Sequence, residues 1–172
     1  MNRQQIRTLA LAGVLSGLTA AVTTIIKIPL PGSGGYIHPG DAIVLIAGLA
    51  LPILSAAAAA GIGGAFADLL AGFAIWSPAT FVIKCLMAIS MAIIIRNGVT
   101  WMRLFIAGII VIFINTIGYF IAEYIIFGNA AAPLVSVIPN SFQTLLGFGV
   151  MCSLSRIIKS IPGTNIKWGK HE

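Results

Sequence analysis

The sequence predicts an all-α integral membrane protein, with six transmembrane helices in one bundle and both termini in the cytoplasm. Two observations lead to this prediction. Of the 172 residues, 59% are hydrophobic and only 8% are charged, whereas a soluble domain carries roughly 25% charged residues. The basic residues lie at the ends of apolar runs, as membrane topology signals do. Lipid is therefore the expected solvent for most of the surface, and 1–172 forms a single membrane domain.

This composition leaves no room for a separate soluble domain. A spanning helix takes about 20 apolar residues, so about five to seven spans would use nearly the whole chain. The sequence contains no Gly-x-x-x-x-Gly-Lys-Ser/Thr phosphate loop, so any ATP-driven step needs a partner protein. The net charge of +6 is spread over the ends of the runs. Because the charges form no single patch, we expect no nucleic-acid partner.

The first apolar run, 8–28, follows Arg3 and Arg7. This start resembles a signal peptide. However, small residues recur along the run and no polar mature domain follows it, so a first membrane helix is the better interpretation. A polar, glycine-rich segment follows at 31–41. Such a segment can lie at membrane depth only where protein covers its backbone.

The next apolar stretch, 42–75, is too long for one span. As a single helix it would measure about 50 Å, against a hydrocarbon core of about 30 Å. Pro52 divides it into a short helix, 41–51, and a longer one, 53–73. The short helix is at the lower limit for a span, so whether it crosses fully stays open. A turn at Trp76-Ser-Pro78 precedes the remaining helices, 79–95, 101–127 and about 137–159, and a polar, basic tail, 160–172.

The basic residues test this division of the chain. They form three clusters: Arg3 and Arg7; Arg96 and Arg103; and Arg156, Lys159, Lys167 and Lys170. Cytoplasmic loops collect Lys and Arg, and six helices put all three clusters on the same side. If 42–75 were one span, the middle cluster would fall opposite the first. The charges therefore favour six spans with cytoplasmic termini.

Polar and ionisable residues inside the spans converge at one expected depth. Each is costly in hydrocarbon, so each should face the bundle interior or water. The rise of 1.5 Å per residue places them near the outer ends of their helices. The group comprises Asp41, Asp68, Lys84, Glu123, Asn140 and Gln143, with Tyr36, Trp76, Thr80 and Tyr119 expected at the same level.

We interpret this layer as a pocket, open to the outside, for a small polar molecule. Aromatic rings beside hydrogen-bonding groups suit a flat heteroaromatic ring. Asp68, Lys84 and Asn140 would hydrogen-bond its substituents, with Gln143 and Glu123 flanking them. The alternative is an Asp68–Lys84 ion pair that only holds two helices together.

The remaining candidates for chemistry have simpler interpretations. His38 lies beside Pro39 in the polar segment, where we expect a loop residue or ligand lid, with Tyr36 and Trp76 also at the mouth. No second His or Cys lies near it, so no metal site is expected. Cys85 and Cys152 lie within apolar runs and have no metal-ligand spacing, which favours simple packing.

Small residues recur every fourth position on the first helix. Such rows let another helix approach closely, either inside the bundle or on a partner protein. A similar row on the third helix ends in a carboxylate, which favours internal packing. The rows are Ala12, Ser16 and Ala20; Gly13, Gly17 and Ala21; and Ala57, Gly61, Gly64 and Asp68.

Several short motifs occur together over residues 6–150. They are Ile6-Arg-Thr-Leu-Ala10, Pro29-Leu-Pro-Gly32, Gly35-Tyr-Ile37, Gly40-Asp41, Gly64-Ala-Phe-Ala-Asp-Leu-Leu-Ala-Gly72, Pro78-Ala-Thr80, Lys84 and Asn140-x-x-Gln143. With the predicted topology, they resemble the substrate-binding S components of energy-coupling factor (ECF) vitamin transporters. The similarity is greatest to a branch that is assigned to pyridoxine, to hydroxymethylpyrimidine and, more distantly, to riboflavin.

The resemblance implies a function. An S component binds a vitamin from outside and docks through its first helix on a membrane-embedded coupling protein. Two cytoplasmic ATPases drive that protein, and the S component topples in the membrane to release its cargo. The chain would thus be a multi-pass protein of a bacterial plasma membrane, with no cofactor of its own and no enzymatic activity. The family's Ala-x-x-x-Ala motif on this helix is replaced here by Ala12-x-x-x-Ser16-x-x-x-Ala20.

Other functions stay open from the residues alone. An ion-coupled secondary transporter could use Asp68 and Glu123 as a relay, although no inverted repeat is evident. A small membrane enzyme could use His38 with Asp41, but no nucleophile, metal or phosphate constellation supports it. A purely structural membrane subunit would bind no small molecule.

Overall fold

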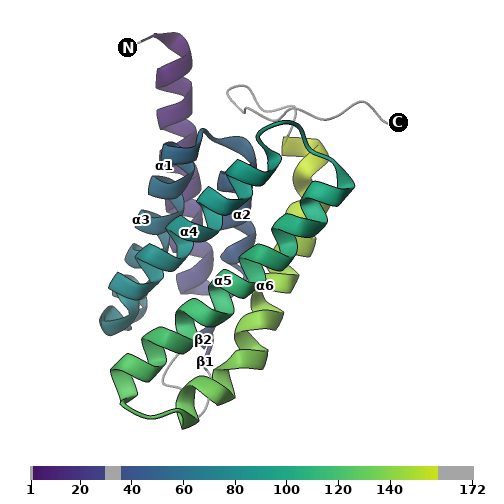
Figure 1. Ribbon diagram of the computed structural model, residues 1–172. Coiled ribbons are helices and arrows are strands. Elements are labelled where there is room, and N and C mark those ends of the chain that lie inside the picture. Colours follow the sequence, from purple (N-terminus) through teal and green to yellow (C-terminus); the bar gives the residue numbers. More distant parts are fainter. Residues whose placement is uncertain (1, 30–35, 159–172) are drawn as a thin grey trace.

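The structure is a computed structural model that describes residues 2–29 and 36–158. It is a helical bundle with a short β-hairpin at one end (Figure 1). The helices are α1 (Arg3–Ile25), α2 (Asp41–Ala50), α3 (Ile53–Ala71), α4 (Ser77–Ile95), α5 (Trp101–Phe127) and α6 (Ala131–Ile158). A single 3-10 turn, η1 (Ala74–Trp76), precedes α4, and β1 (Ile28–Pro29) pairs antiparallel with β2 (Tyr36–Ile37). The predicted tail, 160–172, lies outside the described residues.

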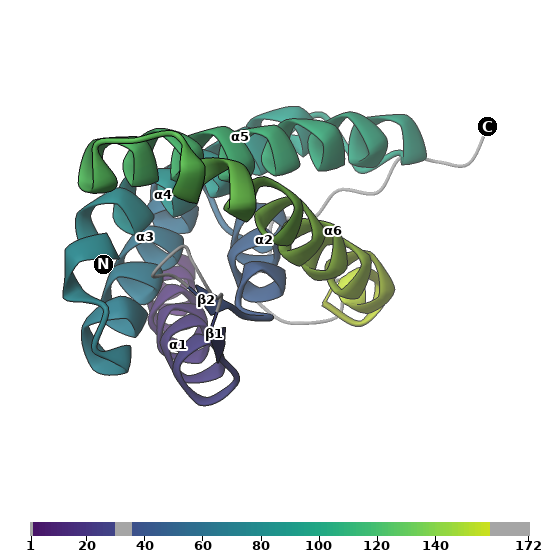
Figure 2. The same ribbon diagram turned by 90° about the horizontal axis from the view of Figure 1, so that it is seen from below.

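Five of the described helices are long and apolar enough to cross a membrane, and the chain is therefore a helical integral membrane protein. The exception is α2, which has 10 residues. It measures about 15 Å, roughly half of a hydrocarbon core. All of its residues except Ile43 are buried, and Figure 2 shows it in the middle of the bundle, with the other helices around it. Its polar ends are thus covered by protein.

The first helix differs from the predicted range, 8–28, at both ends. It begins at Arg3 because the Asn2 side chain accepts a hydrogen bond from the Gln5 amide while the Gln5 side chain accepts one from the Asn2 amide. This reciprocal cap stabilises a polar first turn that hydropathy does not detect. The helix ends at Ile25, since the chain then enters the hairpin, where Ile28 pairs with Ile37.

Three other helices begin or end at residues different from the predicted ones, and for two of them the residues at the turn explain why. Helix α3 ends at Ala71 instead of 73 because Gly72 is left-handed, with φ of 85°. Helix α4 begins at Ser77 instead of 79, since Pro78 fits the first turn of a helix. Helix α6 begins at Ala131, well before 137, and continues through Pro139.

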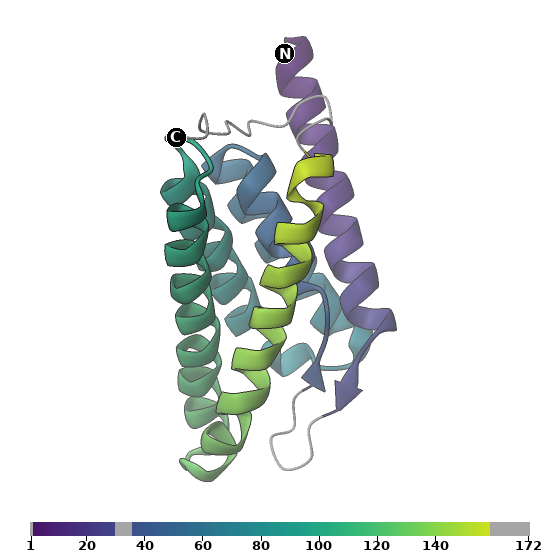
Figure 3. The same cartoon turned by 90° about the vertical axis from the view of Figure 1, so that its right-hand side faces the viewer.

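The helix termini and connections lie at two opposite ends of the bundle. The start of α1, the α4–α5 connection and the end of α6 lie at one end of the bundle, and the hairpin and the α5–α6 connection lie at the other (Figures 1 and 3). Arg3 and Arg7 therefore share an end with Arg96 and Arg103, while the polar residues near the hairpin occupy the opposite end.

The small-residue rows have different surroundings. The α3 row packs internally: a Cβ at Gly61 would meet Cys85 and Phe81 of α4, and Cys85 donates a hydrogen bond to the Ala57 carbonyl (3.2 Å). On α1, Ala12, Ser16 and Ala20 are half-buried, and the Ser16 backbone lies against Gly63 of α3. By contrast, Gly13, Gly17 and Ala21 are exposed, with nothing within 4 Å of a Cβ at either glycine.

A glycine allows α6 to approach the start of α2. A Cβ at Gly147 would lie 2.8 Å from the Ala42 nitrogen and 2.9 Å from the Asp41 Cβ. Real Cβ atoms do not come so close to backbone, so only glycine permits this contact. The contact brings Gln143 and Thr144, one turn away on α6, within reach of the Asp41 carboxylate.

We expect Gly147→Ala to push α6 away from α2 and to destabilise the protein by about 1–3 kcal/mol. The measurement is the thermal unfolding temperature of the purified chain in detergent. Gly149→Ala is the matched control, because a Cβ there has nothing within 4 Å and alanine favours a helix by about 1 kcal/mol. Equal unfolding temperatures for the two variants would contradict the proposed close contact.

Candidate ligand-binding site

The predicted polar layer surrounds one cavity near the hairpin end. Seven separate segments of the chain contribute to it, from β2 to α6. All of its lining residues belong to the predicted set: Tyr36, His38, Asp68, Trp76, Thr80, Tyr119, Glu123, Asn140 and Gln143. The cavity volume is about 20 Å³, which is room for roughly one water molecule. A larger ligand therefore requires the lining side chains to move apart.

Aromatic rings form one part of the wall. The Tyr36 hydroxyl donates to Asp68 Oδ1 (2.7 Å), and its ring lies 4.7 Å from that of Phe73. The Tyr119 and Thr80 hydroxyls are hydrogen-bonded at 3.0 Å, and the Trp76 ring lies 6.3 Å from the Tyr119 ring. Aromatic rings and hydrogen-bonding groups thus line the cavity together, the combination that suits a heteroaromatic ring.

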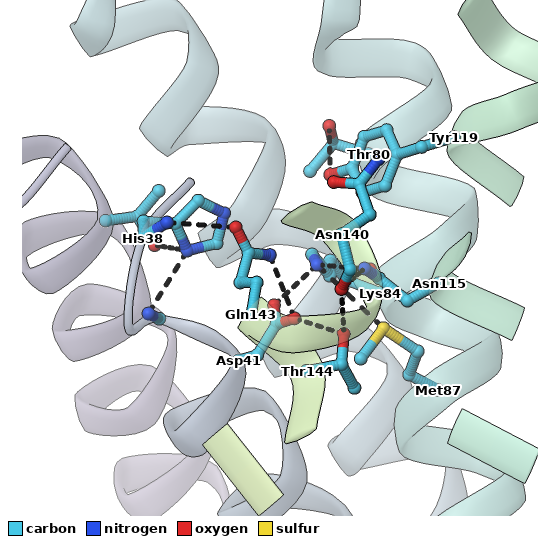
Figure 4. Close-up of polar contacts among 12 residues, drawn as sticks. His38, Asp41, Thr80, Lys84, Met87, Asn115, Tyr119, Asn140, Gln143 and Thr144 are labelled. Carbon is cyan, nitrogen blue, oxygen red and sulfur yellow. Dashed lines mark hydrogen bonds and ion pairs between the residues drawn. The ribbon is translucent and has the colours of Figure 1, made fainter. Parts of the chain in front are cut away.

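A buried polar network lies beside this cavity. Lys84 Nζ contacts Asp41 Oδ1 at 2.5 Å and donates to Asn115 Oδ1 at 2.9 Å (Figure 4). The other Asp41 oxygen accepts from Gln143 Nε2 (3.0 Å) and Thr144 Oγ1 (2.9 Å). Asp41, Lys84, Asn115 and Thr144 are each at most 1% exposed. Asp41 and Lys84 therefore each have an oppositely charged partner and at least one further hydrogen bond, as buried ions require.

The alternative of an Asp68–Lys84 ion pair is wrong. Lys84 pairs with Asp41, whereas Asp68 pairs with Tyr36. Depth along the helices placed all of these residues together, but it did not indicate which neighbour each side chain faces. Neither Lys84 nor Asp41 is among the residues that line the cavity.

Gln143 connects this network to the loop after the hairpin. Its Oε1 atom accepts from the His38 amide (2.9 Å) while its Nε2 atom donates to Asp41. His38 Nδ1 accepts from the Gly40 amide (3.1 Å) and lies 3.3 Å from the Thr23 hydroxyl. The pKa of His38 is lowered to about 4, mainly by burial; Asp41 opposes the shift and Lys84 adds to it. The imidazole is thus neutral at pH 7, with its proton assigned to Nε2 by the Gly40 contact.

A family model described as "ECF-type riboflavin transporter, S component" matches residues 3–163. The chain belongs to this family. The chain is also 26% identical, over 141 residues, to a Pyrococcus woesei protein described as "Uncharacterized protein in gap 3'region". That match covers 82% of this chain and 94% of the relative. The chain is therefore a transport subunit of the S-component type, as the sequence motifs indicated.

Two members of the polar network of this S component were not predicted, Asn115 and Thr144. Asn115 also donates to the Asn140 carbonyl (3.3 Å), so it joins α4, α5 and α6. Asn115 lies one turn before Tyr119, and Thr144 lies one turn after Asn140. A search for uncharged polar residues one turn from the predicted ones would have found both.

Two carboxyl oxygens at the cavity have no hydrogen-bond partner among the described residues, Asp68 Oδ2 and Glu123 Oε2. The Ser136 hydroxyl is likewise buried without a hydrogen-bond partner among the described residues. Because an unpaired buried acceptor is costly, these atoms are the places where a bound molecule would donate hydrogen bonds. Within residues 2–29 and 36–158, no three side chains of His, Cys, Asp or Glu are grouped as metal ligands.

We expect Lys84→Met to destabilise the protein by about 3–5 kcal/mol, because it leaves the Asp41 charge buried without its partner. Combining it with Asp41→Asn should restore part of that loss, since both charges are then gone. Unfolding of the single and double variants in detergent measures this coupling. Lys27→Met, at an exposed lysine, is the control and should change stability little. Additive losses in the double variant would contradict the importance of the pair.

Proposed function

We propose that this S component captures pyridoxine or hydroxymethylpyrimidine in the cavity between β2 and α3–α6. The observation that carries the proposal is the lining of that cavity, which combines aromatic residues with hydrogen-bonding side chains from separate helices. Asp68, Glu123 and Asn140 would bind the ring substituents, and Tyr36 and Trp76 would cover the ring. Asp41 and Lys84 would support the site without lining it.

The size of the cavity favours a single-ring vitamin over a larger one. At about 20 Å³, the cavity must expand to hold any vitamin, since small-molecule pockets span roughly 300–1,000 Å³. A one-ring ligand requires less expansion than the three fused rings of riboflavin. Riboflavin is the alternative substrate, because the description of the matched family names it.

We further propose that the hairpin end faces outside and that both termini are cytoplasmic, with six passages through a bacterial plasma membrane. The basic residues support this orientation, because Arg3, Arg7, Arg96 and Arg103 share the end opposite the cavity and cytoplasmic segments collect Lys and Arg. Helix α2 is too short to span alone, and the segment that precedes it would complete its passage.

Transport requires partners in this proposal: a membrane-embedded coupling protein and two cytoplasmic ATPases that use ATP. The exposed row Gly13, Gly17 and Ala21 is the proposed contact with the coupling protein. Ala12, Ser16 and Ala20 would form the flank of that contact nearest α3. Membership in the family favours this subunit role over a stand-alone ion-coupled transporter.

The vitamin proposal predicts saturable binding of pyridoxine or hydroxymethylpyrimidine to the purified chain, measured by titration calorimetry. Asp68→Asn should weaken binding about 10-fold or more, because a hydrogen bond to a charged group is lost. Binding should also change tryptophan fluorescence. Trp76→Phe should remove that change, whereas Trp101→Phe, at the opposite end of the bundle, should retain it. Saturation by riboflavin alone would favour the alternative, and unchanged affinity in Asp68→Asn would remove that residue from the site.

The docking proposal predicts that Gly17→Leu abolishes co-purification with the coupling protein and its ATPases while leaving vitamin affinity unchanged. A bulky side chain on the exposed row prevents close helix approach. Leu18→Phe, at an exposed position beside the row, is the control and should keep the complex intact. A complex that persists in Gly17→Leu would move the contact to another face.

A further inference from the structure

The two unpartnered carboxyl oxygens restrict what the cavity can bind. Asp68 and Glu123 are 4% and 3% exposed, and both line the cavity. The other oxygen of Asp68, Oδ1, already accepts a hydrogen bond from the Tyr36 hydroxyl. Asp68 Oδ2 and Glu123 Oε2 therefore remain as acceptors that a donor on the ligand can satisfy. They come from different helices, α3 and α5, so they address two different positions on the ligand.

No free cation balances these carboxyl groups among the described lining residues. Lys84 Nζ is paired with Asp41 and hydrogen-bonded to Asn115; it lies 5.2 Å from the centre of the Tyr119 ring but is not among the lining residues. Lys27 is exposed, donates to the Ala71 carbonyl (3.1 Å) and is not among the lining residues. His38 is neutral at pH 7 because its pKa is lowered to about 4.

The helix starts at this end offer few free amides in place of a cation. Helices α2, α4 and α6 all begin here, and helix N-termini are common phosphate sites. However, the Ala42 and Ile43 amides of α2 donate to the Pro39 and Gly40 carbonyls. On α4, Pro78 has no amide hydrogen to donate, and on α6 the Ala131 amide donates to Asn129 Oδ1.

We propose that the site accepts only a phosphate-free ligand that donates hydrogen bonds at two separate positions, namely the free alcohol or amine form of a vitamin. This inference rests on the proposed vitamin-binding function and specifies its substrate class. A phosphate group in proteins is bound by Arg, Lys or unpaired amides. Here it would be desolvated beside two carboxyl groups, with no Arg or Lys among the described lining residues, an arrangement that is strongly unfavourable.

The inference also implies a reaction that must precede binding when the vitamin is supplied as a phosphate ester. A phosphorylated vitamer outside the cell would first have to lose its phosphate to a phosphomonoester hydrolase. In that reaction water supplies the oxygen of inorganic phosphate, and the vitamin leaves as the alcohol. The S component would then bind that alcohol.

Titration calorimetry on the full chain in nanodiscs tests the inference with three matched pairs. These are pyridoxine and pyridoxine 5′-phosphate, hydroxymethylpyrimidine and its monophosphate, and riboflavin and flavin mononucleotide. In whichever pair the alcohol binds, we expect the phosphate ester to bind at least ~100-fold more weakly. An ester that binds within ~3-fold of its alcohol, or more tightly, overturns the inference.

Variants identify the cause of this discrimination. Asp68→Asn with Glu123→Gln keeps the shape of both side chains but removes their acidity, so the alcohol-to-ester ratio should fall below ~10-fold. Lys27→Met is the control and should leave the ratio unchanged. A ratio that stays the same in the double variant overturns the assignment to these carboxyl groups.

Mass spectrometry of the small molecule released on denaturation separates this inference from the proposed function. A phosphate-free vitamin supports both. A phosphate-free compound that is not a vitamin contradicts the proposed function but agrees with the exclusion of phosphate, and a phosphorylated vitamin does the reverse. No released molecule, together with no binding in any of the three pairs, overturns both.

Discussion

The contact between Lys84 and Asp41 places two opposite charges inside a bundle whose outer solvent is lipid. Neither ion is tolerated there alone, because desolvation of a single charge costs several kcal/mol. The pair is completed by Asn115 on one side and by Gln143 and Thr144 on the other. These five residues come from α2, α4, α5 and α6. The network therefore joins the start of the one short helix to three of the long helices around it.

The cavity depends on this network through Gln143. The same amide group that donates to Asp41 accepts from the His38 backbone, so it holds the segment that connects the hairpin to α2. Beyond that segment, Tyr36 reaches Asp68 on α3. The positive charge of Lys84 is thus paired within the network, and the carboxyl groups that line the cavity form no ion pair among the described residues. This separation explains how a chain with a net charge of +6 can present an acidic site.

The depth of the polar side chains in the bundle was predictable from the sequence, but the partner that each side chain contacts was not. Helix rise is constant, so the basic clusters and residue numbers were sufficient to place Asp68, Glu123 and Gln143 at one level. The choice of Asp41 over Asp68 as the partner of Lys84 depends on helix rotation and on the close approach at Gly147, which depth alone does not encode. The hairpin was not predicted, because two-residue strands carry no periodicity.

A structure of the chain with pyridoxine bound tests the central claim most directly. The account predicts that the ring lies between Asp68 and Glu123 beneath Tyr36, with donor groups on both carboxyl groups. It also predicts that Lys84 stays on Asp41, since the pair supports the site without taking part in it. A ligand that contacts Lys84 directly, with the Asp41 pair broken, would contradict the account, as would a ligand bound outside this cavity.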